Sequence, residues 1–141
     1  MKRSAALTPL SREHQHALAL ALALTRATDD DAAGLSRRAA AFWQDESGPH
    51  FEQEETVLLP VLARHAGDDD TDISRVQAEH ADLRGRFARL AASAGRPADL
   101  HELGRRLTDH VRFEERELFP RIESLLGEEE LARVGRLLSA S

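Results

Sequence analysis

HFEQEETVLLP at residues 50–60 is followed later in the chain by HVRFEERELFP at residues 110–120. Both stretches share the pattern H-x-x-x-E-E-x-x-L-[L/F]-P, and a Glu-His pair precedes each of them, at 13–14 and at 79–80. The chain therefore contains an internal repeat of two similar halves. Because residues four apart lie on one face of an α-helix, the repeat predicts two helical hairpins packed around a shared centre.

Apolar residues around the repeat follow a helical spacing. Over residues 73–94 they recur at steps of three and four, and His80 stands in the same row as Ile73 and Phe87. Such a row is typical of the buried face of a bundle helix. The rows of the four main segments also include these ionisable side chains: His14, His50, Glu54, His80, His110 and Glu114.

Turn residues between these rows set the expected helix boundaries. We expect an all-α protein with main helices over about 8–27, 32–65, 72–94 and 97–126, and a short outer fifth helix over about 128–138. Gly48-Pro49 is expected to break or kink the second helix, because proline lacks a backbone donor. Short loops between successive helices predict an up-down-up-down four-helix bundle over about 8–126, within one domain spanning 1–141.

Composition and charge narrow the classes of function. The net charge is −6 with histidine counted as neutral, which disfavours a nucleic-acid partner. The absence of cysteine excludes disulfides, thiolate nucleophiles and Cys-bound zinc, and the absence of tyrosine excludes tyrosyl radicals. No apolar stretch is long enough to span a bilayer, so we expect a soluble cytoplasmic protein with no membrane partner.

The ionisable side chains in the core rows indicate a metal site. Buried imidazoles and carboxylates are costly unless they are paired or bound to metal. Four imidazoles and two carboxylates suit two metal ions, each receiving two histidines, with Glu54 and Glu114 as bridges. Mixed nitrogen and oxygen ligation above four-coordination favours iron or manganese over structural zinc.

Two histidines compete for the ligand position on the first helix. His14 follows Leu10 by four residues and therefore lies in the buried row. His16 follows Arg12 by four residues, which indicates a wetter face. We therefore favour His14.

Other neighbours leave two alternatives open. Glu55 and Glu115 stand one step off the buried rows, so they are expected to be solvated or to support a ligand, with direct coordination as the alternative. Ser47 holds the place in the first half that Leu107 holds in the second. Its small side chain either leaves a path to the metals or reflects the neighbouring Gly48-Pro49.

These motifs resemble the hemerythrin-like family, whose members are also called HHE cation-binding domains. The residues that carry the resemblance are REH at 12–14, HFEQEE at 50–55, EH at 79–80 and HVRFEE at 110–115, together with the two Pro-ended tails. The resemblance extends over about 8–126. It implies two iron ions, oxo- or hydroxo-bridged, in preference to manganese or zinc, with these ligands: His14, His50, Glu54, His80, His110 and Glu114.

The chain differs from the oxygen-carrying hemerythrins at two places. Those proteins have a second histidine four residues after the third-helix histidine, where this chain has Arg84. They also have an aspartate five residues after the fourth-helix histidine, where this chain has Glu115, although Glu114 fits the ligand position better. The ligand set is therefore closer to family members linked to iron-centre repair, nitric oxide response or iron sensing.

The resemblance implies a small diatomic or peroxide ligand as the partner and gives no protein partner. The expected function is binding or reaction of oxygen, peroxide or nitric oxide, in the response to redox or nitrosative stress or in iron handling. A non-enzymatic iron or oxygen sensor or iron reservoir is one alternative, and a reversible oxygen carrier is another. The sequence leaves open whether the chain is an enzyme.

Overall fold

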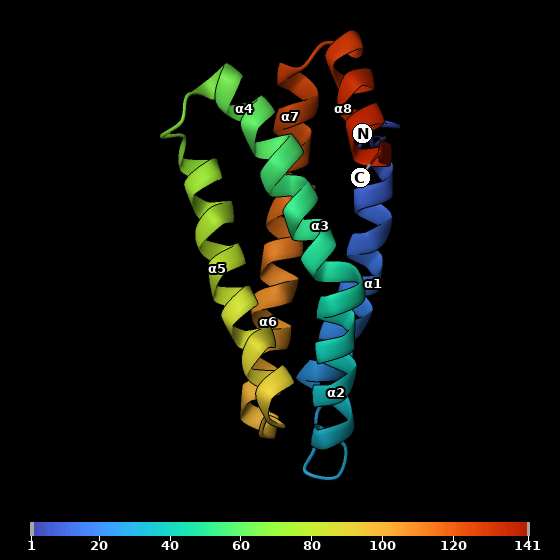
Figure 1. The fold of residues 1–141 in the computed structure, drawn as a ribbon, viewed down its shortest axis with the longest axis vertical. Helices are drawn as coiled ribbons and strands as arrows, with labels where there is room; N and C mark the ends of the chain where they lie inside the picture. Colours follow the sequence, from blue (N-terminus) through green and yellow to red (C-terminus); the bar gives the residue numbers. More distant parts are fainter. Residues whose placement is uncertain (1, 141) are drawn as a thin grey trace.

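The computed structural model describes residues 2–140, and all regular structure among them is α-helical or π-helical (Figure 1). The all-α prediction is therefore confirmed. The first helix is α1 (Thr8–Thr25) and the third is α5 (Thr71–Ala92). The second is one uninterrupted helix made of five consecutive segments, of which the η segments are π-helical. They are α2 (Ala32–Phe42), η1 (Trp43–Ser47), α3 (Gly48–Gln53), η2 (Glu54–Leu58) and α4 (Leu59–Ala66).

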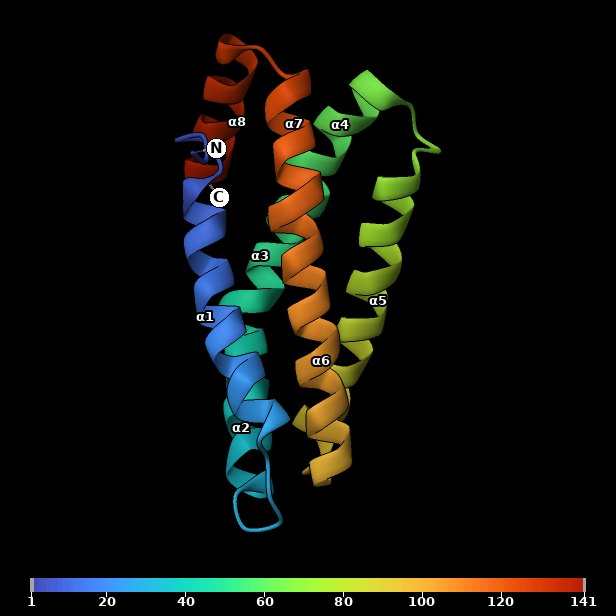
Figure 2. The same cartoon turned by 180° about the vertical axis from the view of Figure 1, so that it is seen from behind.

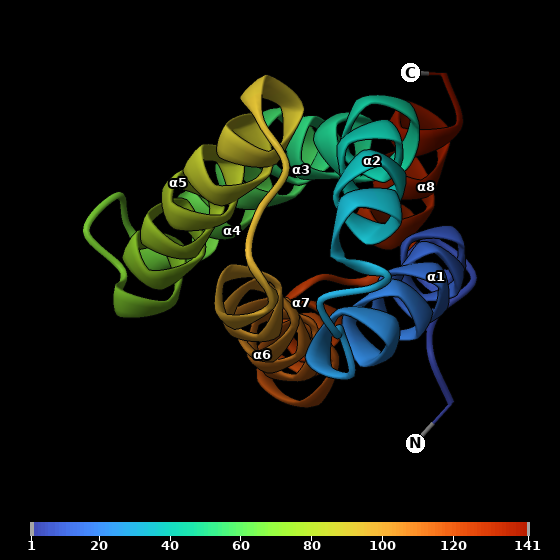
Figure 3. The ribbon, with the colours of Figure 1, turned by 90° about the horizontal axis from the view of Figure 1, so that it is seen from below.

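The fourth helix repeats the design of the second. It consists of α6 (Pro97–Phe113), the π-helical η3 (Glu114–Leu118) and α7 (Phe119–Leu125), and it is followed by α8 (Glu128–Ala140). Successive helices run along the long axis in alternating directions (Figures 1 and 2). The view along that axis shows α1 beside α6, and α2 beside α5 (Figure 3).

The buried apolar residues form two clusters, one toward each end of the helices. One cluster includes Leu7 and Leu10 of the N-terminal part together with Val134 and Leu138 of α8. The other includes Ala17 of α1 together with apolar residues of α5 from Leu83 onward and of α6 up to Val111. His14 stands between Leu10 and Ala17 in the chain, so the ionisable residues of each main helix come between the two apolar clusters.

Close contact between α1 and α6 depends on Gly104. A Cβ atom at this position would lie 2.7 Å from the carbonyl oxygen of Ala21 and 2.8 Å from Cγ2 of Thr25. Both distances are shorter than ordinary van der Waals contact. Glycine therefore allows the two helix backbones to approach to this separation.

Gly48-Pro49 does not break the second helix, so of the two expectations for it, a break or a kink, the break is wrong. The Gly48 backbone N–H donates to the carbonyl of Trp43 in a π-helical turn, immediately before Pro49. The same arrangement precedes Pro60, where Leu59 donates to Glu54, and Pro120, where Phe119 donates to Glu114. The wider turn changes the hydrogen-bond register next to a residue that has no donor, so the helix continues.

None of the helices in the described range 2–140 is both long and apolar enough to cross a lipid bilayer.

Candidate metal centre

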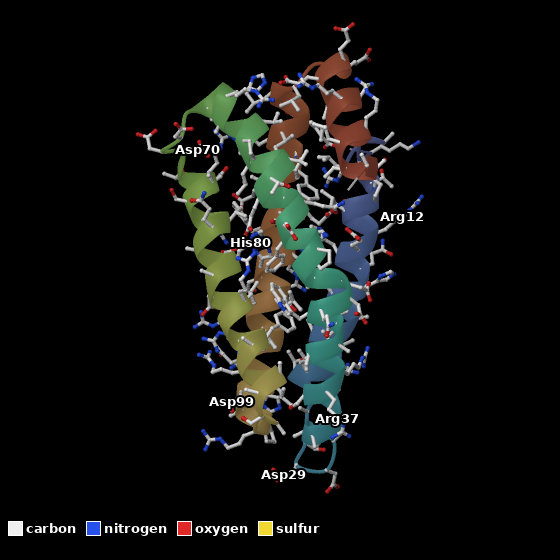
Figure 4. All side chains as sticks on the ribbon, in the orientation of Figure 1. Arg12, Asp29, Arg37, Asp70, His80 and Asp99 are labelled. Atoms are coloured by element: carbon white, nitrogen blue, oxygen red, sulfur yellow. The ribbon has the colours of Figure 1, made fainter. Side chains whose placement is uncertain are left out.

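The structure brings the six residues of the sequence prediction together midway along the helices. His14 comes from α1, His50 from α3, His80 from α5 and His110 from α6. The two carboxylates, Glu54 and Glu114, are the first residues of η2 and η3. All six are buried, and both glutamates are 0% exposed. His80, labelled in Figure 4, marks the level of the centre along the long axis.

Each of the two central carboxylates lies between one histidine of each half. Oε1 of Glu114 is 2.8 Å from Nε2 of His14, and its Oε2 is 3.2 Å from Nε2 of His110. Oε2 of Glu54 is 3.1 Å from Nε2 of His50, and its Oε1 is 3.0 Å from Nε2 of His80. All four imidazoles therefore turn the same ring nitrogen toward the two carboxylates.

These donors form two groups of four, and both groups contain Glu54 and Glu114. One group adds His14 and His50, and the other adds His80 and His110. Within each group, the potential ligand atoms lie within 4.8 Å of one another. Two metal ions that share both carboxylates would use this grouping.

Four of the inward-facing atoms have no hydrogen-bond partner among residues 2–140, because the two close pairs that they form lack hydrogen-bonding geometry. They are Oε1 of Glu54, Oε2 of Glu114, Nε2 of His80 and Nε2 of His110. Buried polar atoms in proteins are nearly always hydrogen-bonded, so four such atoms at one place require an explanation. Cations bound by the lone pairs of these atoms would satisfy all four, and imidazole nitrogen with carboxylate oxygen is a donor set that iron accepts. The residues present therefore fit the metal pair that the sequence suggested.

A second layer of four glutamates holds the outer nitrogens of the same imidazoles. The Nδ1 atom of each histidine is hydrogen-bonded to a different glutamate: His14 to Glu115 at 2.6 Å, His50 to Glu13 at 2.9 Å, His80 to Glu55 at 2.7 Å and His110 to Glu79 at 2.7 Å. An ionised carboxylate can only accept a hydrogen bond, so Nδ1 is the donor in every pair. The rings are thereby fixed with Nε2 toward the centre.

These outer contacts bear on the role of Glu55 and Glu115. They also identify two further glutamates, Glu13 and Glu79, whose role the sequence did not indicate. Glu55 and Glu115 are hydrogen-bonded to His80 and His14, which agrees with the expectation that they support a ligand candidate. Glu13 and Glu79 were recognised only as parts of the Glu-His repeat. Their repetition directly before His14 and His80 was the signal that both halves need a carboxylate at this position.

The electrostatic balance at the centre favours positive charge. Burial lowers the pKa of His80 and His110, but the neighbouring carboxylates outweigh it and raise the pKa to about 9 and about 10, respectively. Burial raises the pKa of Glu114, but the positive charge of His110 and the contact with His14 at 2.8 Å hold it well below the usual range. The surroundings therefore stabilise the ionised form of Glu114 and the charged forms of His80 and His110.

Aromatic rings cover two of the imidazoles. Phe51 stacks on His80 with ring centroids 3.9 Å apart and an interplanar angle of 3°, and Phe119 stacks on His14 at 5.3 Å and 18°. Both phenylalanines are buried. They shield the centre from water and limit the movement of the two rings.

The remaining candidates lie away from the centre. The side chain of His16 is 64% exposed and is hydrogen-bonded to Glu46 at 2.9 Å. Arg84, which stands where oxygen carriers have an additional histidine, is 44% exposed and donates to Glu55 at 3.0 Å. The last two histidines are also outside the centre. His65 is hydrogen-bonded to Glu130 at the surface, and the half-buried His101 is hydrogen-bonded to the carbonyl of Ala27.

Comparison with known proteins gives a match at the level of the family. The family model described as Hemerythrin HHE cation binding domain matches residues 6–122. No curated protein and no solved structure matches the chain. The matched range contains all six central residues and all four outer glutamates.

Proposed function

Because the chain belongs to the hemerythrin HHE cation-binding family, whose members bind metal ions and usually iron, we propose that it holds two iron ions in the buried centre. The proposed ligands are His14, His50, Glu54, His80, His110 and Glu114. We further propose that the first four helices form an up-down-up-down four-helix bundle around this pair, as one domain with α8 outside.

One observation carries this proposal. Two groups of four buried donors share Glu54 and Glu114, and four atoms within the groups have no hydrogen-bond partner in the described part of the chain. Without cations, the folded state would contain buried polar atoms left unsatisfied, at a cost of about 1–3 kcal/mol for each. Metal binding removes that cost and uses the shared carboxylates.

Bound iron would supply the electrons for a reaction with oxygen, peroxide or nitric oxide. The residues of the chain supply position and shielding. Glu79 and its three counterparts each hold a proton on Nδ1 of one imidazole, which keeps Nε2 free to bind metal. Phe51 and Phe119 cover two of the imidazoles and exclude water from the centre.

The donor set favours a reaction over reversible oxygen storage. The two groups of donors are equivalent between the halves, and Arg84 adds no ligand to either of them because it pairs with Glu55 at the surface. We therefore propose that the reduced protein reacts with oxygen irreversibly. The role in redox or nitrosative stress or in iron handling, and the cytoplasmic location, are parts of the same proposal.

A second candidate is a non-enzymatic iron sensor or reservoir. Every one of the four main helices contributes at least one of the central donors, so metal occupancy is coupled to the packing of the whole fold. A ligand that binds only the folded state stabilises it by mass action. Peroxide turnover by the iron-loaded protein would favour the enzyme, whereas a large fall in melting temperature on chelation without turnover would favour the sensor.

Metal analysis combined with an optical spectrum tests the proposal. Protein expressed with ample iron is expected to contain two iron ions per chain and to show near-ultraviolet charge-transfer bands. Glu54→Ala should lower the iron content, whereas Glu52→Ala, at an exposed position two residues earlier, should not. A single tightly bound zinc ion without those bands would contradict the proposal.

A further inference from the structure

Arg3 lies in the segment before α1 and donates to three acceptors on the fourth helix. Its Nη1 atom donates to Oε1 of Glu123 on α7 at 2.7 Å. Its Nη2 atom donates to the backbone carbonyl of Glu115 on η3 at 2.8 Å and to Oε1 of the same residue at 3.3 Å. Only 21% of its side chain is exposed. The planar guanidinium therefore fixes these acceptors relative to one another.

The carbonyl of Glu115 needs a donor from outside its own helix. Phe119, four residues further on, gives its N–H to Glu114 in the π-helical turn, and Pro120, five residues further on, has no N–H. A helix carbonyl without an intrahelical donor is normally satisfied by a side chain or by water. Arg3 is that donor, so it occupies a position that the π-helical turn before Pro120 creates.

Glu115 and Phe119 are also the two supports of the His14 imidazole. Oε2 of Glu115 is hydrogen-bonded to Nδ1 of His14 at 2.6 Å and accepts from the hydroxyl of Ser11 at 2.7 Å. The ring of Phe119 stacks on His14, and the Arg3 guanidinium lies over the same ring, 5.5 Å from its centroid. Arg3 therefore contacts both the carboxylate at the outer nitrogen of His14 and the ring that covers its face.

Two of the other outer glutamates are also paired with arginines, but those arginines belong to α5. Arg84 donates to Glu55 at 3.0 Å, and Arg75 donates to Glu79 at 2.8 Å. Of these three arginines, only Arg3 lies outside the four main helices. The segment before α1 thus supplies to the first donor group the kind of support that α5 supplies to the second.

The segment that contains Arg3 is anchored independently of this side chain. Leu7 is 0% exposed and belongs to the same apolar cluster as Leu138 of α8. The backbone N–H of Ser4 donates to the carboxylate of Glu123. Removing the Arg3 side chain should therefore leave the segment in place, and its main effect is expected at Glu115 and the imidazole beyond it.

We propose that Arg3 is a positioning residue for the metal centre. By holding the carbonyl and the carboxylate of Glu115 and the face of Phe119, it keeps the His14 imidazole turned with Nε2 toward Glu114. The inference rests on the proposed function, in which His14 is a ligand. It extends the support of the centre to a segment that precedes the first helix.

The first test compares iron affinities by competition with a chelator. Arg3→Ala should lower the affinity about three- to tenfold, less than loss of an outer carboxylate, because the imidazole keeps its acceptor. Arg3→Lys keeps the charge but lacks the planar fork that reaches several groups, and it should restore part of the affinity. Arg121→Ala is the matched control, since it also removes an arginine with two carboxylate partners, Asp70 and Asp72 at the start of α5.

The second test needs no metal. The Nδ1–H proton of His14 is followed by NMR in metal-free protein with isotope-labelled histidines, and its resonance is assigned by its loss in His14→Ala. The bond to Glu115 should hold this proton downfield in the wild type. In Arg3→Ala the resonance should move upfield and exchange faster with water, whereas in Arg121→Ala it should stay unchanged. A merely structural role of Arg3 would move neither property.

The outcomes separate the proposed function from the role of Arg3. Wild-type protein that takes up no iron would reject the proposed function, and the NMR comparison would still test the positioning of His14. An unchanged His14 resonance in Arg3→Ala would overturn the inference, as would an equal fall in iron affinity in Arg121→Ala. If Arg3→Ala does not fold, Arg3→Lys decides, with smaller changes expected in the same direction.

A double-mutant comparison tests whether Arg3 acts through Glu115. Two residues that act through one contact have effects that do not add. Arg3→Ala should therefore lower the iron affinity less in the Glu115→Ala background than in the wild type. An equal fall in both backgrounds would show that Arg3 acts by another route and would overturn the inference.

Discussion

Nδ1 of His110 on α6 lies 2.7 Å from Oε1 of Glu79 on α5, so a proposed metal-binding histidine of one helix is fixed by a carboxylate of its neighbour. Arg75 in turn holds Glu79 at 2.8 Å, on the same helix. The pKa of Glu79 is lowered, because its hydrogen bonds from His110 and Arg75 outweigh the burial that would raise it. The orientation of a buried ring therefore depends on a residue that reaches the protein surface.

Replacing Glu79 should weaken metal binding without removing a ligand. In Glu79→Ala the Nδ1–H of His110 loses its acceptor, and we expect the affinity for iron to fall about 10- to 100-fold. Glu79→Gln keeps an acceptor oxygen and should restore part of the affinity. Competition with a chelator measures both effects, with the exposed Glu52→Gln as control. Equal affinity in Glu79→Ala and wild type would show that the outer carboxylate does not position the ring.

The two histidines of α1 should respond differently to substitution. His14→Ala removes a donor that lies 2.8 Å from Glu114, and it should lower the iron content and weaken the optical bands. His16→Ala removes only an exposed contact with Glu46 and should leave both unchanged. The opposite pattern would mean that α1 is rotated relative to this structure.

Two glycines should change stability in opposite directions. Gly104→Ala places a Cβ 2.7 Å from a backbone oxygen of α1 and should destabilise the fold by about 1–3 kcal/mol. Gly85→Ala lies on the exposed face of α5 with no atom within 4 Å of the new Cβ, and it should stabilise by about 0.5–1 kcal/mol. Denaturant unfolding measures both changes. A neutral Gly104→Ala would mean that α1 and α6 can separate at little cost.

Asp70 provides a pH-dependent contribution to stability. Its side chain accepts from the backbone N–H of Asp72 and Ile73 at the start of α5, and from Arg121 of α7 at 2.7 and 2.8 Å. Arg121 is the main reason that the pKa of Asp70 is lowered from 3.8. Asp70→Ala should cost about 1–2 kcal/mol at neutral pH.

The sign of the pH dependence follows from that lowered pKa. A carboxyl with a lower pKa in the folded state stabilises the fold at pH values above its unfolded pKa, and this contribution is lost as the pH falls through the folded pKa. The difference in unfolding free energy between wild type and Asp70→Ala should therefore be constant near neutrality and shrink below about pH 4. Asp68→Ala, exposed and two residues earlier, is the control. A difference that grows toward low pH would contradict this account.

The sequence predicted the elements that depend on periodic burial. The row that contains Ile73, His80 and Phe87 is buried as far as Leu90, because its spacing matches the helical period, whereas Ala94 at its expected end is exposed and lies beyond α5. The family resemblance is confirmed by the match over residues 6–122. The clustering of the six central side chains also follows from rows that meet at one level of the fold.

The parts that the sequence did not predict depend on interactions between helices or on a change of helical period. The π-helical turns at η1, η2 and η3 have no spacing signature of their own, and a break or a kink was therefore expected at Gly48-Pro49. The pairing of Glu13 with His50 joins residues on different helices. The spacing of apolar residues indicates which face of a helix is buried, but it does not indicate which residue at the edge of that face contacts the next helix.

The crossed contacts between the halves determine what half of this protein could do by itself. Glu114 and Glu115 of the second half hold the two ring nitrogens of His14, while Glu54 and Glu55 of the first half hold those of His80. Each hairpin thus contacts both ring nitrogens of one histidine that belongs to the other hairpin. The loop at residues 67–70 joins the two hairpins covalently. Their association is therefore intramolecular and has a high effective concentration, and it does not require two separate chains to meet. The covalent connection therefore supplies one copy of each hairpin to the centre, and this pairing does not depend on protein concentration.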